Sequence, residues 1–164
     1  MSVAGGNLSR GIVAVAHADD ETLWCGGYLI EHPTDVLCCS IPTDTQRAID
    51  FFDACKVLGV NGYICGKNEK YQDVVAAQVF AESYDHIITH NSIGEYGHKF
   101  HIKVHKAMKE LGLPMQVFNY GLQDGEPIDW TRKLKALSCY TTRPDVLRNQ
   151  SKRFILSRES LIPL

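Results

Sequence analysis

The sequence predicts an α/β fold, in which a mostly parallel β-sheet lies between helices on both of its faces. Short apolar runs alternate with segments of helical periodicity along most of the chain, as expected for strand–helix–strand units. The first run, GIVAVA at 11–16, is apolar without interruption, which is typical of a strand buried on both faces. The 164 residues contain no internal repeat, low-complexity block or linker, so we expect a single domain over 1–164.

Five apolar runs are short enough to be strands, and a helical segment follows each of them. Parallel strands need such crossovers, because a tight hairpin can join only antiparallel neighbours. In chain order the expected strands are 11–16 (GIVAVA), 35–41 (DVLCCSI), 62–66 (GYICG), 85–90 (DHIITH) and 115–121 (MQVFNYG).

The helices are expected between these strands. The second helix has the clearest ends, since Thr43, Asp44 and Thr45 are candidate N-caps and Gly59 is a C-terminal stop signal. The segment NSIGEYG is expected to be a loop, and the tail after Arg143 gives no clear prediction. In chain order the expected helices are 21–31, 43–60, 73–83, 98–111 and 130–137.

Composition and charge argue against several classes of protein. A net charge of −2 gives no electrostatic footprint for nucleic acid or for an anionic membrane surface. No apolar run approaches the roughly 18 residues that a membrane span requires, and the first residues lack the apolar stretch of a secretory signal. The six cysteines form no CxxC pair, which disfavours a zinc ribbon or a disulfide framework. We therefore expect a cytoplasmic protein, and the sequence leaves open whether it is a homo-oligomer.

Histidines and carboxylates gather directly after the first and the fourth expected strands. Ligands of parallel sheets bind beyond the carboxyl ends of the strands, so both groups are expected at one edge. On a helix that starts near residue 98, the histidines at 98, 101 and 105 lie within about 60° of one another. The first group is His17, Asp19 and Asp20, and the second is His90, Asn91, Glu95, Tyr96, His98, His101 and His105.

The acidic run Asp19-Asp20-Glu21 has two interpretations. It suits the first turn of a helix, where the helix dipole favours negative charge. It also suits a metal site, because a cation relieves the repulsion between neighbouring carboxylates, and three ligands leave one position for water. The coincidence of both clusters after strands favours the metal site. His105 is expected to be a buried histidine rather than a ligand.

Two linked motifs of the sequence resemble those of the LmbE-like, PIG-L-type N-acetylglucosaminyl deacetylases. AHADDETLWCGG (16–27) resembles the AHPDDE…GG motif of that family, and THNSIGEYGHKFHIKVH (89–105) resembles its second motif. RAIDFFDACKVLGV (47–60) and LKALSCY (134–140) are similar to further segments in the same order. The resemblance spans residues 11 to about 141 and implies a Rossmann-like, three-layer αβα sandwich.

The resemblance implies a zinc ion held by His17, Asp20 and His101, although ferrous iron can occupy similar ligands. It implies further roles for residues near that ion. Asp19 would be the general base, His98 would stabilise the oxyanion or protonate the leaving amine, and Tyr96 would reach the same oxyanion. Two positions match residues that contact substrate in the family: Arg47 and Asn91.

The sequence departs from the family pattern in two places. Ala18 stands where proline is usual, and Phe100 stands in the HKFH segment where the family has a carboxylate. An imidazole needs a partner that fixes its tautomer. We therefore expect another residue, Asp50 or Glu95, to orient His98.

The chemistry that these residue types permit is the hydrolysis of an amide. A metal lowers the pKa of water and polarises a carbonyl, and a neighbouring carboxylate can accept the proton. The resemblance implies removal of an N-acetyl group from an amino-sugar conjugate of the N-acetylglucosamine type. Two alternatives stay open: a metal-dependent amidase with a non-sugar N-acyl substrate, and a non-catalytic ligand-binding domain of the same fold. A thiol enzyme using Cys25 is disfavoured, because no histidine relay lies near it in the sequence.

Overall fold

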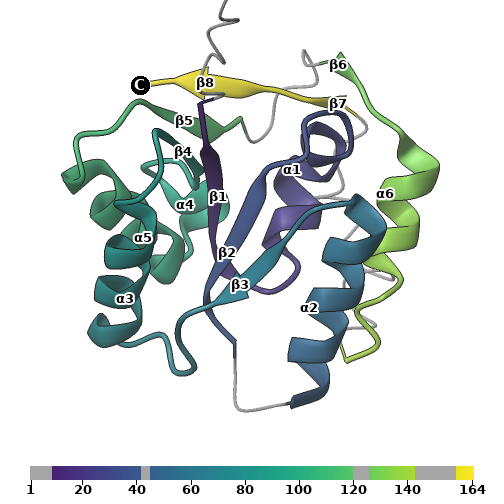
Figure 1. Ribbon diagram of the computed structural model, residues 1–164, viewed down its shortest axis with the longest axis horizontal. Coiled ribbons are helices and arrows are strands. Elements are labelled where there is room, and N and C mark those ends of the chain that lie inside the picture. The colour runs from purple at the N-terminus through teal and green to yellow at the C-terminus, as the bar shows by residue number, and fades with distance from the viewer. Residues whose placement is uncertain (1–8, 42–44, 120–125, 143–157) are drawn as a thin grey trace, which may run out of the picture.

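The computed structural model describes residues 9–41, 45–119, 126–142 and 158–164. One sheet has the strand order β3-β2-β1-β4-β5-β8, in which the first five strands are parallel and β8 is antiparallel to β5 (Figure 1). A second sheet pairs β6 with β7. The strands are β1 (Gly11–His17), β2 (Asp35–Ser40), β3 (Gly62–Ile64), β4 (His86–Thr89), β5 (Met115–Phe118), β6 (Glu126–Pro127), β7 (Arg158–Glu159) and β8 (Leu161–Pro163).

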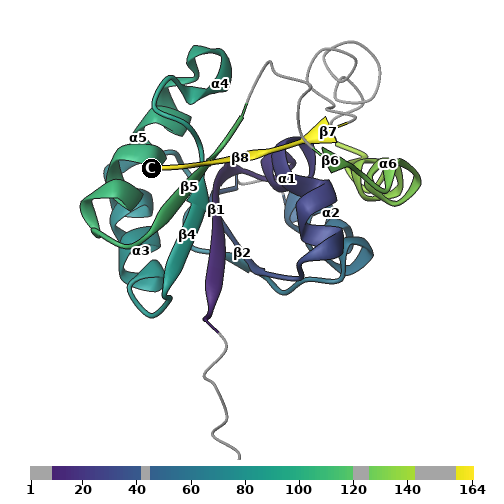
Figure 2. The ribbon, with the colours of Figure 1, turned by 90° about the horizontal axis from the view of Figure 1, so that it is seen from above.

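Helices cover both faces of the large sheet, as Figure 2 shows from above. Side chains alternate along β1, so that Val13 and Val15 pack on one side and Ile12, Ala14 and Ala16 on the other. The first side is covered by α1, α2 and α6, and the second by α3 and α5. The predicted three-layer αβα sandwich is therefore confirmed. The helices are α1 (Asp20–Glu31), α2 (Thr45–Leu58), α3 (Tyr71–Ala81), α4 (Gly94–Gly97), α5 (Lys99–Glu110) and α6 (Trp130–Leu137).

The structure differs from the sequence prediction in three segments, one of which is the short strand β6, Glu126–Pro127, where no element was predicted. The expected loop at 91–97 contains a single helical turn, α4, and the unassigned tail contributes β7 and the edge strand β8. Strands of two or three residues are too short to show a period of two, and Pro163 marks β8 as an edge strand. The candidate caps Thr43 and Asp44 lie outside the described residues, and Thr45 is the first residue of α2. None of the described helices has the length and apolar character of a membrane span.

A buried ion pair ties α1 to α6 and to the C-terminal segment. The helix α1 is interrupted at Cys25, where φ is −144°, so backbone amides beyond the kink need other acceptors. Glu159 accepts hydrogen bonds from the amides of Gly27 and Tyr28, at 3.0 and 2.9 Å, and Lys133 Nζ lies 2.5 Å from Glu159 Oε1. This pair fixes the helix whose first residue belongs to the site described next.

Candidate metal centre

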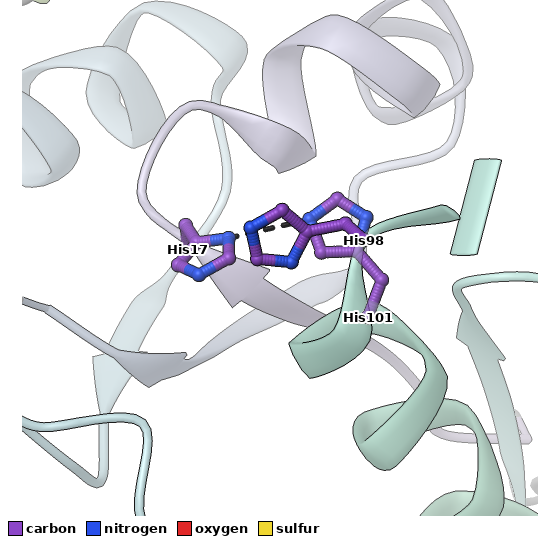
Figure 3. Close-up of side chains that lie close together, drawn as sticks. All are labelled: His17, His98 and His101. Atoms are coloured by element: carbon purple, nitrogen blue, oxygen red, sulfur yellow. Dashed lines mark hydrogen bonds between the residues drawn. The ribbon is translucent and has the colours of Figure 1, made fainter. Parts of the chain in front are cut away.

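The polar clusters meet where β1 and β4 lie side by side in the middle of the sheet. The strand that follows β1 in the chain, β2, lies on one side of this central pair, and the strand that follows β4, β5, lies on the other side. Ligands of α/β folds bind at the point where the strand order reverses in this way. His17 is the last residue of β1, Asp20 is the first of α1, and His101 lies in the first turn of α5. Figure 3 shows the rings of His17, His98 and His101 close together above this point.

Three side-chain atoms form a nearly equilateral triangle. His17 Nδ1 and His101 Nε2 each lie 3.3 Å from Asp20 Oδ2, and the two nitrogens are 3.2 Å apart. A tetrahedral zinc ion about 2.0–2.1 Å from each ligand would separate the ligand atoms by about 3.3 Å. The donor set, two imidazoles and one carboxylate, also suits zinc. The residues that the sequence predicted as ligands therefore converge, and their spacing fits a metal ion.

His90 is also near the triangle, but both of its ring nitrogens have other partners. It lies 3.6 Å from Asp20 and stacks on His101 with ring centroids 3.9 Å apart. Its Nε2 accepts a hydrogen bond from the amide of Ala16 at 2.9 Å, and its Nδ1 faces Glu95 Oε2 at 2.8 Å. A lone pair that already accepts a hydrogen bond does not coordinate a metal. His90 therefore supports the site rather than serving as a ligand.

Each candidate histidine ligand has a carboxylate at its other ring nitrogen. Glu95 Oε2 lies 2.6 Å from His101 Nδ1, and Glu69 Oε1 lies 2.9 Å from His17 Nε2. Such partners fix the tautomer and the ring orientation of metal-binding histidines. The backbone of Glu95 has φ 57°, which is a strained conformation. Asn91 stabilises it, because its Oδ1 accepts a hydrogen bond from the Glu95 amide at 3.0 Å.

The charges around the triangle favour a cation at its centre. Burial opposes a positive charge on His101, but Asp20 and Glu95 raise its pKa to about 10. Burial likewise opposes ionisation of Glu95, but His90 and His101 lower its pKa to about 2. The pKa of Asp20 is held well below its usual value, against its burial, chiefly by His101. The carboxylates that stabilise a proton on His101 Nε2 would stabilise a metal ion at the same point.

Asp19 lies between two candidate ligands in the chain and has a different partner. Its Oδ2 accepts a hydrogen bond from Arg47 Nη2 at 3.0 Å, and the same Nη2 donates to the carbonyl oxygen of Ala18. Both side chains are buried, and the backbone of Asp19 has φ 102°. Arg47 therefore holds the candidate base in position. Its predicted contact with substrate stays a prediction.

His98 begins the helix α5 as its N-cap residue. Its Nδ1 accepts the amide hydrogen of Phe100 at 3.3 Å, so a neutral His98 carries its proton on Nε2. Burial, together with the positive charges of His101 and His17, lowers the pKa of His98. The ring is therefore a neutral hydrogen-bond donor, and its centroid lies 4.8 Å from that of His17 and 4.5 Å from that of His101.

The residues expected to orient His98 have other partners. Glu95 contacts His90 and His101, as described above, and Asp50 accepts hydrogen bonds from Thr141 and Thr142, which follow α6. The amide of Phe100 takes the expected role instead, through the backbone and not through a side chain. The expectation that Asp50 or Glu95 orients His98 was therefore wrong.

Two other predicted site residues take different positions. Tyr96 is 51% exposed, and its ring centroid lies 5.6 Å from that of His101, so it overhangs the triangle from the solvent side. Asn91 uses its side chain within the protein: Nδ2 donates to the Phe118 carbonyl oxygen, and Oδ1 accepts from the Ile93 amide besides that of Glu95. Asn91 therefore shapes the loop before α5, and its contact with substrate stays a prediction.

The structure adds three residues whose roles the sequence did not reveal: Glu69, His90 and Trp24. Glu69 follows β3 in an irregular segment without any motif, so no sequence signal identified it. Trp24 is buried and donates from Nε1 to Asp20 Oδ1 at 3.1 Å, which leaves Oδ2 to face the histidines. The spacing of Asp20 and Trp24, one helical turn apart, was the only available signal.

A Glu95→Gln variant is expected to bind zinc about 10- to 100-fold more weakly than the wild type and to unfold at a lower temperature, because two buried histidines lose their charged partner. The amide keeps the size of the side chain but removes the negative charge that His101 and His90 face. Titration with zinc against a competing chelator measures the affinity. A Glu110→Gln variant, at an exposed position on α5, is the control. Equal affinities of Glu95→Gln and wild type would contradict the role given to Glu95.

No protein-family model matches the chain, and no curated protein sequence matches it. Solved structures match at low identity. The A40926 pseudoaglycone deacetylase Dbv21 has a TM-score of 0.69 and 18% identity, over 94% of this chain and 96% of its own. The N,N'-diacetylchitobiose deacetylase of Pyrococcus horikoshii has a TM-score of 0.64 and 12% identity, over 94% and 84%. GalB of Pseudomonas putida, a 4-carboxy-2-hydroxymuconate hydratase, has a TM-score of 0.63 and 14% identity, over 94% and 96%.

These similarities show a shared fold, and the fold that the LmbE-like resemblance implied is confirmed. The matched proteins include two deacetylases and a hydratase, so the fold alone does not select one reaction. The reaction has to be argued from the site.

Proposed function

We propose that the chain is a zinc-dependent hydrolase that removes the acetyl group from an N-acetylated amino sugar or a conjugate of one. The triangle of His17 Nδ1, Asp20 Oδ2 and His101 Nε2, with sides of 3.2–3.3 Å, carries this proposal. These three residues would hold the ion. When bound, zinc would polarise the acyl carbonyl and make water a better nucleophile near neutral pH.

Asp19 is assigned the role of general base. It is adjacent to the ligand Asp20 in the chain, and none of the triangle's contacts uses its carboxylate. Arg47 donates to Asp19 Oδ2 at 3.0 Å and so holds the carboxylate in place beside the ligand Asp20, and we assign this carboxylate the proton of the attacking water. The amide nitrogen must gain a proton before the C–N bond breaks, and protonated Asp19 can supply it. The sum of these steps is one water consumed, with acetate and a free amine formed.

His98 is assigned to the oxyanion. The Phe100 amide holds Nδ1 as an acceptor, so the N–H on Nε2 is available to the negative oxygen of the tetrahedral intermediate. A neutral donor suits this role, because it needs no change of protonation before it acts. We assign Tyr96 a second hydrogen bond to the same oxygen, and a ring centroid 5.9 Å from that of His98 supports this role.

The test is acetate release by the zinc-loaded protein. N-Acetylglucosamine, its conjugates and simple N-acetyl amines are supplied in turn, before and after removal of metal with a chelator. We expect zinc-dependent release from amino-sugar substrates that stops with the chelator and returns with added zinc. Acetate release only from the simple N-acetyl amines would show that the protein is an amidase whose substrate is not an amino sugar. No release from any amide would overturn the proposal, and the hydration of an unsaturated acid, the type of reaction that GalB performs, would then be tested next.

A further inference from the structure

A cavity of about 520 Å³ opens beside the candidate metal centre. Its lining includes His98, Tyr96 and Glu69, together with Lys99 and Lys103 of α5. The cavity adjoins the triangle directly, because Glu69 contacts His17 at 2.9 Å and the ring of His98 lies 4.8 Å from that of His17. A substrate whose amide lies at the triangle would therefore extend its remaining atoms along this wall.

The two lysines give the wall a positive charge. Lys99 and Lys103 are one helical turn apart and exposed, and neither forms an ion pair with another residue of the described ranges. Glu69 is the acidic residue of the lining, and its carboxylate is engaged by His17 Nε2. Like charges one turn apart disfavour a helix slightly, and an anion between them would remove this cost.

The alternative is that these lysines are ordinary solvent-exposed residues on the outer face of α5 and bind no ligand. Lys106 and Lys109 are also exposed on this helix and do not line this cavity. What sets Lys99 and Lys103 apart is that they share a wall with His98 and Tyr96, which the proposed reaction places at the oxyanion. Lys106 therefore serves as a matched control, because it has the same charge and exposure on the same helix.

We propose that this cavity receives an anionic group of the substrate, a carboxylate or a phosphate, through Lys99 and Lys103. The substrate would then be an acidic N-acetylated amino sugar. This inference rests on the proposed hydrolase function for its kinetic test, and it narrows the substrate class of the same site. Two ammonium groups on flexible side chains suit either anion, since a lysine acts as a point charge and does not impose the planar geometry of arginine.

The kinetic test compares neutral N-acetylglucosamine with its 6-phosphate and with N-acetylmuramic acid, which carries a carboxylate. We expect kcat/KM to be about tenfold or more higher for at least one acidic substrate, and which of the two gains identifies the anion. The double variant Lys99→Ala/Lys103→Ala should remove this preference, mainly through KM, and leave turnover of the neutral substrate within about twofold. Lys106→Ala should behave as the wild type. A preference that survives the double variant, or that Lys106→Ala removes equally, would overturn the inference.

A binding measurement separates this inference from the hydrolase proposal. Calorimetry compares glucosamine 6-phosphate with glucosamine on the zinc-loaded wild type and on the same variants, without any turnover. Tighter binding of the phosphate that weakens with salt and with Lys99→Ala/Lys103→Ala would support the cavity as an anion site even if no amide is hydrolysed. Equal binding of the two sugars, together with equal kcat/KM for neutral and acidic substrates, would contradict the inference even if acetate release is found.

Discussion

An Asp19→Asn variant is expected to lose acetate release by about a factor of 10³ while it keeps the metal content of the wild type. Asparagine has the same shape and tolerates the left-handed backbone conformation of this residue, φ 102°, better than most side chains. Its amide cannot accept the proton of water at neutral pH. The carboxylate of Asp19 takes no part in the triangle of His17, Asp20 and His101, so the metal should remain.

The Asp19→Asn variant also changes the environment of Arg47. The guanidinium of Arg47 is buried and would lose its ionic partner at 3.0 Å, so the Tm is expected to fall by a few degrees. Metal analysis, kcat and thermal unfolding on one preparation separate these effects. An Arg47→Lys variant, which keeps the charge near Asp19, should lose less activity than Asp19→Asn. Turnover of Asp19→Asn near that of the wild type would show that another group accepts the proton.

The strands that the sequence predicted best are those with an uninterrupted apolar run. The strands β1, β2 and β4 are apolar on both faces, and each was predicted to within a residue or two of its observed ends. The turn α4 could not be predicted, because two of its four residues, Glu95 and Tyr96, have non-helical backbone angles. The strands β7 and β8 could not be predicted either, because segments of two and three residues are too short to show a period of two.

The place of the candidate site was predictable from the order of the elements, because both polar clusters follow strands of a parallel sheet and so lie at one edge of it. The choice of His17, Asp20 and His101 from these clusters came from the resemblance to the LmbE-like family. The supporting groups were not predictable in the same way. An imidazole has two nitrogens, and only coordinates show that those of His90 are used by Ala16 and Glu95. The wrong expectation for Asp50 has the same origin, because its partners Thr141 and Thr142 are some ninety residues away in the chain.

A His101→Ala variant is expected to lose both bound metal and acetate release. The substitution removes one corner of the triangle, and the remaining two ligands, His17 and Asp20, hold a zinc ion much more weakly than three. It also leaves the buried carboxylates of Asp20 and Glu95 without the cation that lowers their pKa values. The contrast with Asp19→Asn, which keeps the metal and loses only the reaction, is the central test of the assigned roles.

Thermal unfolding with and without added zinc measures the loss directly. A ligand that binds the folded state at 100 times its Kd stabilises it by about 2.7 kcal/mol, so zinc should raise the Tm of the wild type by several degrees. His101→Ala should show almost no such rise. His105→Ala is the matched control, because His105 is one turn further along α5, is buried, and contacts the His90 carbonyl oxygen at 2.8 Å. It should unfold at a lower temperature than the wild type but keep the rise with zinc. If His101→Ala kept stoichiometric zinc, the ion would bind elsewhere and the water-activating centre would have to be sought outside the triangle.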